Sequence, residues 1–374
     1  MKALALVLAF VPVLPIPAQP VVSPEVHPDR SVTFRLAAPD ARGVTLRCEG
    51  VAESALQKQP DGVWSFTTEP LAPDVYSYSF VVDGVRMPDP ANPLLKYNLL
   101  DTTSQVHVPG PPSLPWEINE IPHGVIHRHF YQSAVIGLDR DFYVYTPPEY
   151  DPASARAYPV LYLLHGYSDA ADAWTSVGCA NVILDNLIAR GQAKPMVVVM
   201  PLGYGNQEVL AGGWARVRTP ETQAIRRDSD TKFRDALLNE IIPMVEHAYR
   251  VSSDRRDRAI AGLSMGGRQS LLIGLNAPDR FAWIGAFSSG GVNADFAATY
   301  PAVDASLSAR LRLLWVSCGQ QDGLLDVNQQ LVEWLTAKGV TVSWLPVPGE
   351  HSFRVWRRNL AQFVPLLFQG KSRP

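Results

Sequence analysis

The chain has 374 residues, of which 47% are hydrophobic and 18% charged, and its formal net charge is −3 with the histidines neutral. This length exceeds one typical domain, and the near balance of acidic and basic residues gives no basis for nucleic-acid binding. The three cysteines, Cys48, Cys179 and Cys318, are odd in number and widely spaced, which favours buried free thiols over a disulfide framework or a metal site.

The first residues are typical of an export signal. Lys2 precedes an apolar run from Ala3 to Leu14, and Pro-Ile-Pro-Ala follows. This pattern predicts a secretory signal peptide over residues 1–18, with cleavage after Ala18. The run is short and interrupted by prolines, so it does not fit a membrane span. We therefore expect a secreted or periplasmic protein with no membrane partner, with a non-cleaved anchor as the alternative.

Residues 25–108 contain short runs in which apolar and polar side chains alternate. Turn signals separate these runs, such as Pro-Asp-Gly at 60–62 and Val-Asp-Gly at 82–84. The pattern predicts an immunoglobulin-like β-sandwich. The expected strands are Ser31–Leu36, Val44–Cys48, Val63–Thr67 and Val75–Val82. Prolines are frequent over 109–121, which predicts a stiff linker to a second domain over 122–370.

The second domain begins with two apolar runs that predict buried parallel strands. Tyr158–Leu164 leads into His165-Gly166-Tyr167-Ser168-Asp169, where a turn with small residues follows the strand. Met196–Met200 leads into a long polar insertion that is rich in glycine. Alternation of such strands with helical segments predicts a mostly parallel sheet with helices on both faces.

The most informative motif is Gly262-Leu263-Ser264-Met265-Gly266. It stands between a strand-like run, Arg258–Ala261, and a helix-forming segment, Arg268–Leu275. That order is the nucleophile elbow of an α/β-hydrolase, a sharp turn that exposes one serine at the end of a strand. Side chains at 262 or 266 would collide with the neighbouring strand or helix. Ser264 is therefore the candidate nucleophile.

A serine nucleophile needs a base and an orienting acid, which in this fold follow in the order Ser, Asp or Glu, His. His351 is the only histidine after Ser264. Asp322 is the best placed acid, since it follows the strand-like run Leu311–Ser317. Three other carboxylates are less well placed, in the next helix (Leu324–Lys338), beside the base or after an earlier strand: Asp326, Glu350 and Asp295.

The tetrahedral intermediate of acyl transfer needs preorganised N–H donors for its oxyanion. The first expected donor is the backbone N–H of Met265, the residue after the nucleophile. The second is expected from the loop after Tyr158–Leu164, where we assign it to Tyr167. His165 precedes this donor and is expected to brace the loop rather than to transfer protons.

These segments resemble the esterase D type family of α/β-hydrolases, which includes feruloyl and acetylxylan esterases of carbohydrate esterase family 1. The matching segments are Asp141–Tyr150, Tyr158–Ser168, Arg258–Gly267, Phe281–Gly290 and the turn at His351. The resemblance implies the triad Ser264, Asp322 and His351, with an oxyanion hole from Met265 and the Gly166-Tyr167 loop. The same family covers siderophore esterases, S-formylglutathione hydrolases and mycolyl transferases, so the resemblance defines the mechanism better than the substrate.

The first domain resembles carbohydrate-binding modules of family 48, on Gly62-Val63-Trp64, the segment from Tyr76 to Gly84, and Asp89-Pro90. Sugar binders of that family tend to carry a tryptophan two residues after Asp-Gly, where this chain has Arg86. The departure argues against α-glucan binding. By analogy, such a module before an esterase favours a plant-polysaccharide substrate.

Aromatic side chains are candidates for a pocket that holds a planar acyl group. They are Trp174, Tyr204 and Trp214, whose alternative role is to hold a long loop. Four arginines of the insertion would instead favour an anionic substrate: Arg216, Arg218, Arg226 and Arg227. His123, His127 and His129 do not have the spacing of a zinc motif, so we expect no metal and no cofactor.

The sequence thus predicts a secreted serine esterase that acts on acyl esters of plant cell-wall polysaccharide. The leading hypothesis is a feruloyl esterase that releases ferulate from feruloylated arabinoxylan through an acyl-enzyme. The alternatives are an acetylxylan esterase, then an enterobactin-type siderophore esterase, and last a non-catalytic carbohydrate-binding protein. The acyl group, the glycan and the oligomeric state stay open.

Overall fold

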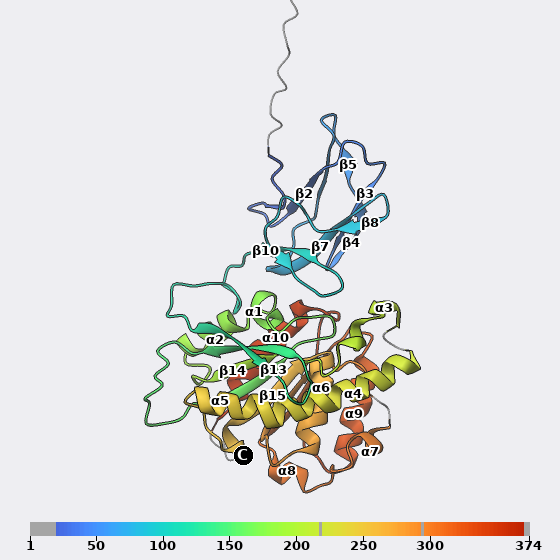
Figure 1. Cartoon of the computed structure of the whole chain (residues 1–374). Coiled ribbons are helices and arrows are strands. Elements are labelled where there is room, and N and C mark those ends of the chain that lie inside the picture. Colours follow the sequence, from blue (N-terminus) through green and yellow to red (C-terminus); the bar gives the residue numbers. More distant parts are fainter. Residues whose placement is uncertain (1–19, 217–218, 293–294, 370–374) are drawn as a thin grey trace, which may run out of the picture.

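A computed structural model describes residues 20–216, 219–292 and 295–369, which form two bodies (Figure 1). We call residues 25–108 the β domain and residues 122–369 the α/β domain. The predicted signal peptide at 1–18 lies outside the described residues. No helix in the described ranges is both long and apolar enough to cross a membrane.

The β domain consists of two antiparallel sheets around one core. One sheet has the order β1 (Glu25–Val26), β2 (Val32–Ala37), β6 (Val63–Thr67) and β5 (Gln57–Lys58). The other has the order β4 (Val51–Ala55), β3 (Val44–Cys48), β7 (Asp74–Val82), β10 (Thr103–Val108) and β9 (Leu95–Lys96), with β8 (Val85–Met87) paired to β7. Trp64, Tyr76 and Tyr78 are buried in the core between the sheets, so these aromatic rings stabilise the domain rather than form a sugar-binding platform.

The segment over 109–121 is packed against the α/β domain. Trp116 is buried in that domain's core. Glu117 accepts hydrogen bonds from the N–H groups of Gly110 and Leu114, and Asn119 donates to Asn186. The predicted linker is therefore held against the second domain through residues 114–119.

The α/β domain is built on one eight-stranded sheet. Its order is β11 (Val125–Gln132), β12 (Asp139–Thr146), β14 (Val197–Pro201), β13 (Val160–Leu164), β15 (Arg258–Leu263), β16 (Trp283–Phe287), β17 (Leu313–Gly319) and β18 (Ser343–Val347). From β14 to β18 all neighbours are parallel, whereas β11 and β12 are antiparallel. Strands β13 to β16 are fully buried, as expected for a parallel sheet covered on both faces.

Helices cover both faces of this sheet (Figure 1). One face packs against α2 (Ala180–Ala189) and α10 (Phe353–Phe363). The other packs against α4 (Pro220–Ala236), α5 (Ile242–Ala248), α6 (Met265–Asn276) and α9 (Leu325–Ala337). The short helices are α1 (Ala173–Ser176), η1 (Gln207–Leu210), α3 (Gly213–Arg216), η2 (Leu237–Ile241), η3 (Arg255–Asp257), α7 (Phe296–Thr299), α8 (Leu307–Arg310) and η4 (Val364–Leu366).

The polar insertion after β14 differs most from the sequence-based expectation. It contains α4, a 17-residue helix that continues through the π-helical turn η2 into α5. The Thr219 hydroxyl caps its N-terminus by accepting the N–H of Thr222. The apolar residues on its inner side are few and widely spaced, which is why a polar loop was expected. Phe233 and Leu237 are nevertheless fully buried in the core under the sheet.

The two domains meet at a buried ion-pair cluster. Asp74, the first residue of β7, has no exposed surface. Its carboxylate contacts Arg354 Nε at 3.3 Å, Arg357 Nη2 at 3.3 Å and Arg358 Nη2 at 2.5 Å. A buried carboxylate is tolerated only with such compensation, and Arg357, whose side chain is 1% exposed, needs the carboxylate in turn. All three arginines belong to α10, so the β domain is attached to the helix that begins two residues after His351.

We expect Asp74→Ala to lower the free energy of unfolding by about 3 kcal/mol, because Arg357 would stay buried without its carboxylate partner. Urea unfolding followed by far-UV circular dichroism measures this change. Glu53→Ala is the matched control, because the Arg47–Glu53 pair is half exposed on both sides and its loss should cost less than about 1 kcal/mol. Equal losses in the two variants would contradict the assigned role of Asp74.

Candidate active site

Ser264 lies at a strained turn between β15 and α6. Its backbone angles are φ 51° and ψ −113°, a conformation that side-chain-bearing residues rarely adopt. Two backbone bonds hold it: the Ser264 N–H donates to Phe287 O at 2.8 Å, and the Gly290 N–H donates to Ser264 O at 2.9 Å. The turn is therefore stabilised by the neighbouring strand β16 and the loop after it.

The flanking glycines permit this turn because their neighbours approach closely. A Cβ atom on Gly262 would lie 2.6 Å from the carbonyl carbon of Gly266. A Cβ atom on Gly266 would lie 2.5 Å from Leu164 O, at the end of β13. Both contacts are with backbone atoms, so a side chain at either position would force the strand and the helix apart.

The structure brings Ser264, His351 and Asp322 together from loops after three different strands. His351 Nε2 lies 3.0 Å from Ser264 Oγ, and His351 Nδ1 lies 2.7 Å from Asp322 Oδ2. Asp322 Oδ1 accepts the N–H of Leu324. The rival Asp326 lies instead in the first turn of α9.

Asp322 is held in its ionised form. Burial of its side chain raises the pKa of the carboxyl group, but the hydrogen bond and charge of His351 and the N–H of Leu324 outweigh burial and lower the pKa below its ordinary value. An ionised Asp322 accepts a proton-bearing Nδ1 of His351. The Nε2 atom of that tautomer is then free to take the proton of Ser264.

The loop Gly166–Asp169 lies beside Ser264. A Cβ atom on Gly166 would be 3.6 Å from Ser264 Cβ. The Gly166 N–H donates to Asp169 Oδ2 at 3.1 Å, so this group is occupied. The N–H groups of Tyr167 and Met265 have no acceptor among the described residues. These are the two groups that the sequence assigned to an oxyanion hole.

Buried side chains brace this loop from behind. His165 Nδ1 donates to Gly166 O at 2.8 Å, and His165 Nε2 accepts the N–H of Gly203 at 2.8 Å. Burial lowers the pKa of His165 to about 4, so it is neutral at neutral pH and can make both bonds. The Tyr204 hydroxyl contacts the carbonyl oxygens of Gly166 and Asp169.

The three predicted pocket aromatics lie in different environments. Trp174 has no exposed surface, since it packs between Phe287 and Phe353 and donates to Leu164 O. Tyr204 is 1% exposed. Buried side chains cannot form the wall of an open pocket, so the expectation for Trp174 and Tyr204 is corrected to a supporting role. Trp214 is 56% exposed, and its ring contacts Tyr167 edge-on at 4.9 Å.

Two arginines, Arg226 and Arg268, lie near Ser264, and the sequence analysis did not predict that they are close to the nucleophile. A Cβ atom on Gly290 would be 2.9 Å from Ser264 Oγ, and one on Gly291 would be 2.7 Å from Arg226 Nη1. Arg268, which is buried against Asp230, donates to Gly290 O. The Ser-x-Gly-Gly segment at 288–291 was the only local signal for this cluster, and it does not identify the arginines.

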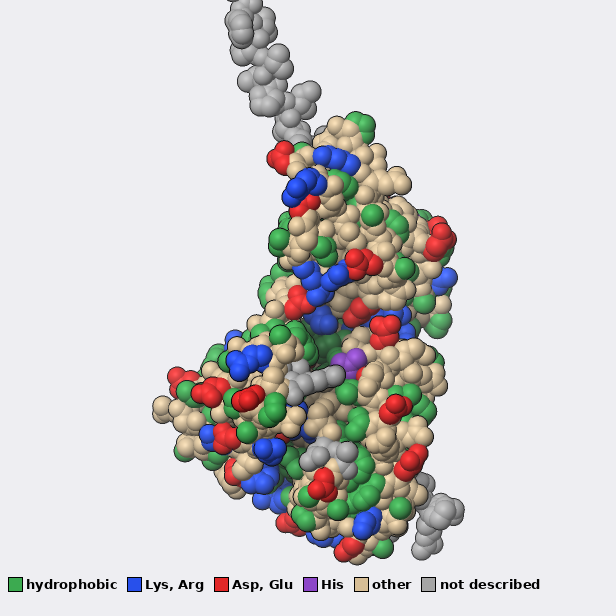
Figure 2. Space-filling model, turned by 90° about the vertical axis from the view of Figure 1, so that its right-hand side faces the viewer, with side chains coloured by type: hydrophobic (Ala, Val, Ile, Leu, Met, Phe, Trp, Pro, Cys, Tyr) green, Lys and Arg blue, Asp and Glu red, His purple; other side chains and the backbone are tan. Residues whose placement is uncertain are grey.

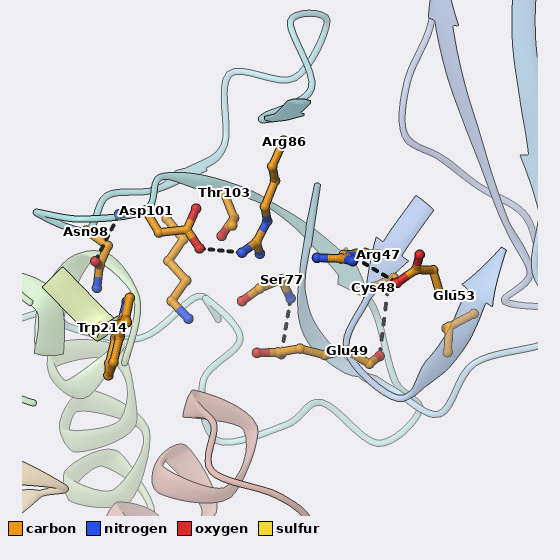
Figure 3. A pocket seen from close by; sticks show the side chains of 12 residues that line it. Arg47, Cys48, Glu49, Glu53, Ser77, Arg86, Asn98, Asp101, Thr103 and Trp214 are labelled. Carbon is orange, nitrogen blue, oxygen red and sulfur yellow. Dashed lines mark hydrogen bonds and ion pairs between the residues drawn. The ribbon is translucent and has the colours of Figure 1, made fainter. Parts of the chain in front are cut away.

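A cavity of about 370 Å³ lies between the β domain and Trp214 (Figure 3). The surface is visibly hollowed between the two bodies, with charged side chains of both signs around the hollow (Figure 2). In the cavity wall Arg47 pairs with Glu53 and Arg86 pairs with Asp101. Lys96 and Glu49 complete the charged lining, so cations and anions are equal in number.

The histidines of the segment at 123–129 have separate partners. His123 contacts Asp185, His127 contacts Thr146 and His129 contacts Tyr249. In the parts of the chain that the structure describes, no group of three or more His, Cys, Asp or Glu side chains is placed to hold a metal ion. The three cysteines are free thiols.

Curated relatives include esterases of two substrate types. The chain is 30% identical over 357 residues to an endo-1,4-beta-xylanase/feruloyl esterase of Xylanibacter ruminicola, a match that covers 92% of this chain and 46% of that protein. It is 24% identical over 277 residues to the iron(III) enterobactin esterase of Escherichia coli, covering 71% of this chain and 63% of the relative. The chain thus spans about half of the first relative's length.

Solved structures share the fold. A ferulic acid esterase of Anaeromyces mucronatus matches with a TM-score of 0.56 and 24% identity, over 67% of this chain and 93% of that chain. The enterobactin esterase of Shigella flexneri matches with a TM-score of 0.68 and 21% identity, over 90% of this chain and 92% of the other. The second match includes most of the β domain as well.

A family model described as "Putative esterase" matches residues 133–367, which include Ser264, Asp322 and His351. This match covers more than half of the chain and nearly all of the α/β domain. The chain therefore belongs to this esterase family.

Proposed function

We propose that this protein is a serine esterase that hydrolyses hydroxycinnamoyl esters of plant cell-wall polysaccharide, as a feruloyl esterase does. The hydrogen-bonded series Asp322–His351–Ser264 carries the proposal for the reaction. The similarity to a relative named as a xylanase/feruloyl esterase supports the substrate. Export through the segment at 1–18 is part of the same proposal, since polymeric cell-wall substrates lie outside the cell.

In the proposed mechanism, His351 Nε2 takes the proton of Ser264 Oγ while that oxygen attacks the ester carbonyl carbon. Asp322 stabilises the imidazolium that forms. The N–H groups of Met265 and Tyr167 hold the oxyanion of the tetrahedral intermediate. His351 then gives the proton to the departing sugar oxygen, and an acyl-enzyme remains. Water repeats the two steps and releases the acid.

Trp214 is proposed to bind the sugar chain that carries the acyl group. It is the exposed aromatic side chain of the predicted three, it contacts Tyr167, and it forms the α/β-domain wall of the cavity in Figure 3. A flat indole offers a stacking face for a pyranose or furanose ring. The balanced charges of the opposite wall suit a neutral ligand with many hydroxyl groups better than an anion.

A second candidate function is hydrolysis of an anionic catecholate ester of the enterobactin type. The specific observation is Arg226, which contacts Gly291 close to Ser264 and could pair with a negatively charged acyl group. An acetylxylan esterase would use the same catalytic groups with a smaller acyl pocket. Substrate comparison separates these possibilities.

We expect Ser264→Ala to abolish hydrolysis of methyl ferulate and p-nitrophenyl acetate. Asp322→Asn should lower kcat by about 10⁴, because His351 would lose its orienting acceptor. Asp326→Asn is the matched control and should retain wild-type rates, since that carboxylate lies in the first turn of α9 and His351 Nδ1 is bonded to Asp322 instead. The absorbance of released ferulate or p-nitrophenolate reports the rates.

The same assay, applied to feruloyl, acetyl and catechoyl esters, distinguishes the candidate substrates. Ser264-dependent turnover of acetate esters alone would assign an acetylxylan esterase and overturn the feruloyl assignment. Turnover restricted to a catechoyl-serine ester would assign the siderophore function. Full activity of Ser264→Ala would disprove the whole mechanism.

Trp214→Ala should raise KM for feruloylated arabinoxylan oligosaccharides about tenfold, the equivalent of one lost stacking contact. The kcat for methyl ferulate, which has no sugar, should stay within about twofold. Phe130→Ala removes another exposed aromatic ring, on β11, and serves as the control. A KM increase that is the same for both esters would count against sugar binding at Trp214.

A further inference from the structure

The β domain reaches the loop beside Ser264 through the turn after β9. Asn98 Nδ2 donates to Asp169 Oδ1 at 3.1 Å, across 71 residues of chain. The next residue, Leu99, donates its backbone N–H to Ser168 O at 2.7 Å. Figure 3 shows Asn98 at the edge of the cavity that faces the α/β domain. Two hydrogen bonds from one turn therefore hold the end of the Gly166–Asp169 loop.

Asp169 connects Asn98 to the backbone of the Gly166–Asp169 loop, which we call the oxyanion loop because it carries the Tyr167 N–H. It is 5% exposed, and each of its carboxylate oxygens has its own donor. Oδ1 accepts from Asn98, and Oδ2 accepts the N–H of Gly166. A carboxylate is planar, so a donor on one oxygen restricts the direction of the other. With the Gly166 N–H bound in this way, the following N–H, that of Tyr167, is left for a substrate.

The backbone of the loop requires external support. Ser168 has φ 67°, in the left-handed region that non-glycine residues avoid. Its carbonyl oxygen accepts the N–H of Leu99, while its own side chain is fully buried. The strained residue stands between Tyr167 and Asp169, so relaxation at Ser168 would rotate the Tyr167 peptide.

Asn98 is itself fixed by the β domain. Its Oδ1 atom accepts the N–H groups of Leu100 at 3.1 Å and Asp101 at 3.2 Å. Because both N–H groups need an acceptor, the amide oxygen of Asn98 must face its own turn. The NH₂ group then faces Asp169. Asp101 is paired with Arg86 of β8, which ties the turn to the sandwich.

The β domain also contacts the other half of the site. Lys96 Nζ lies 5.5 Å from the centre of the Phe353 ring, at the start of α10 and two residues after His351. The Asp74 cluster attaches the same helix. The Gly166–Asp169 loop and the helix that begins after His351 thus both rest against the β domain.

We propose that Asn98 is a positioning residue: through Asp169 it orients the oxyanion loop so that the Tyr167 N–H points at the ester carbonyl. The β domain is then a part of the machinery for every ester, small or polymeric. This inference rests on the proposed function, because it takes Ser264 as the nucleophile and Tyr167 as an oxyanion donor.

The test compares Asn98→Ala and Asn98→Asp with wild type on p-nitrophenyl acetate and methyl ferulate. Loss of a well-aimed oxyanion donor costs about 10²–10³ in rate, and partial misalignment less. Asn98→Ala should therefore lower kcat about 10- to 100-fold on both esters, with KM within about twofold. Tyr97→Ala, an exposed neighbour on the same turn, is the matched control and should leave kcat unchanged.

The pH profile separates positioning from a general loss of structure. Asn98→Asp keeps the two bonds that Oδ1 accepts but places a second carboxyl group against Asp169. The charged groups that act on Asp169 are Lys96 and His351, and Tyr204 is the other titratable neighbour. Burial raises the pKa of Asp169 to about 6, so a shared proton can bridge the two carboxyl groups in mildly acidic solution.

We expect the kcat of Asn98→Asp, relative to wild type at the same pH, to recover as the pH falls from 8 to 5. Asn98→Ala has no second carboxyl group to share a proton with Asp169, so its relative kcat should show no comparable recovery over this range. Asn98→Asp is close in size to the native residue, so it tests the proposal even if the alanine variant fails to fold. Identical profiles for the two variants, or wild-type kcat in Asn98→Asp at pH 8, would overturn the inference. An inactive wild type on both esters would instead overturn the proposed function.

Discussion

The strained backbone at Ser264 is the constraint on which the rest of the site depends. The turn persists because Phe287 O and the Gly290 N–H hold Ser264 from the adjacent strand, and because Gly262 and Gly266 let helix and strand approach. These contacts require β13, β15 and β16 to be parallel neighbours in register. The carboxyl ends of the strands then meet at one edge of the sheet, where Asp322 and His351 reach the serine.

Two buried carboxylates connect the β domain to this edge. Asp74 attaches α10, the helix after His351, and Asp169 receives Asn98 beside the oxyanion loop. Burial makes each carboxylate costly unless all its partners are present, so both contacts depend strongly on how the domains are placed. The domain boundary therefore lies beside the site.

The same catalytic groups serve esters that differ widely in charge and size. The distinction between them lies in side chains around Ser264 rather than in the triad. In the proposed function, Trp214 and the charge-balanced cavity favour a neutral sugar chain, whereas Arg226 near Gly291 would favour an anionic acyl group. Feruloyl and enterobactin esterases are both among the proteins of similar fold, as expected when function resides in the site and not in the fold.

Local patterns in the sequence were sufficient to predict the strands that build the sheet, the elbow at Ser264 and the order Ser, Asp, His, because each depends on a short run of residues and a turn. They did not show that Trp174 and Tyr204 are buried, or that the polar insertion contains the 17-residue α4. Nor did they show that Asn98 contacts Asp169. Such contacts join segments that are far apart in the chain, so no local periodicity records them. Only the packing of the two domains decided which polar groups are bound and which N–H groups remain free at the site.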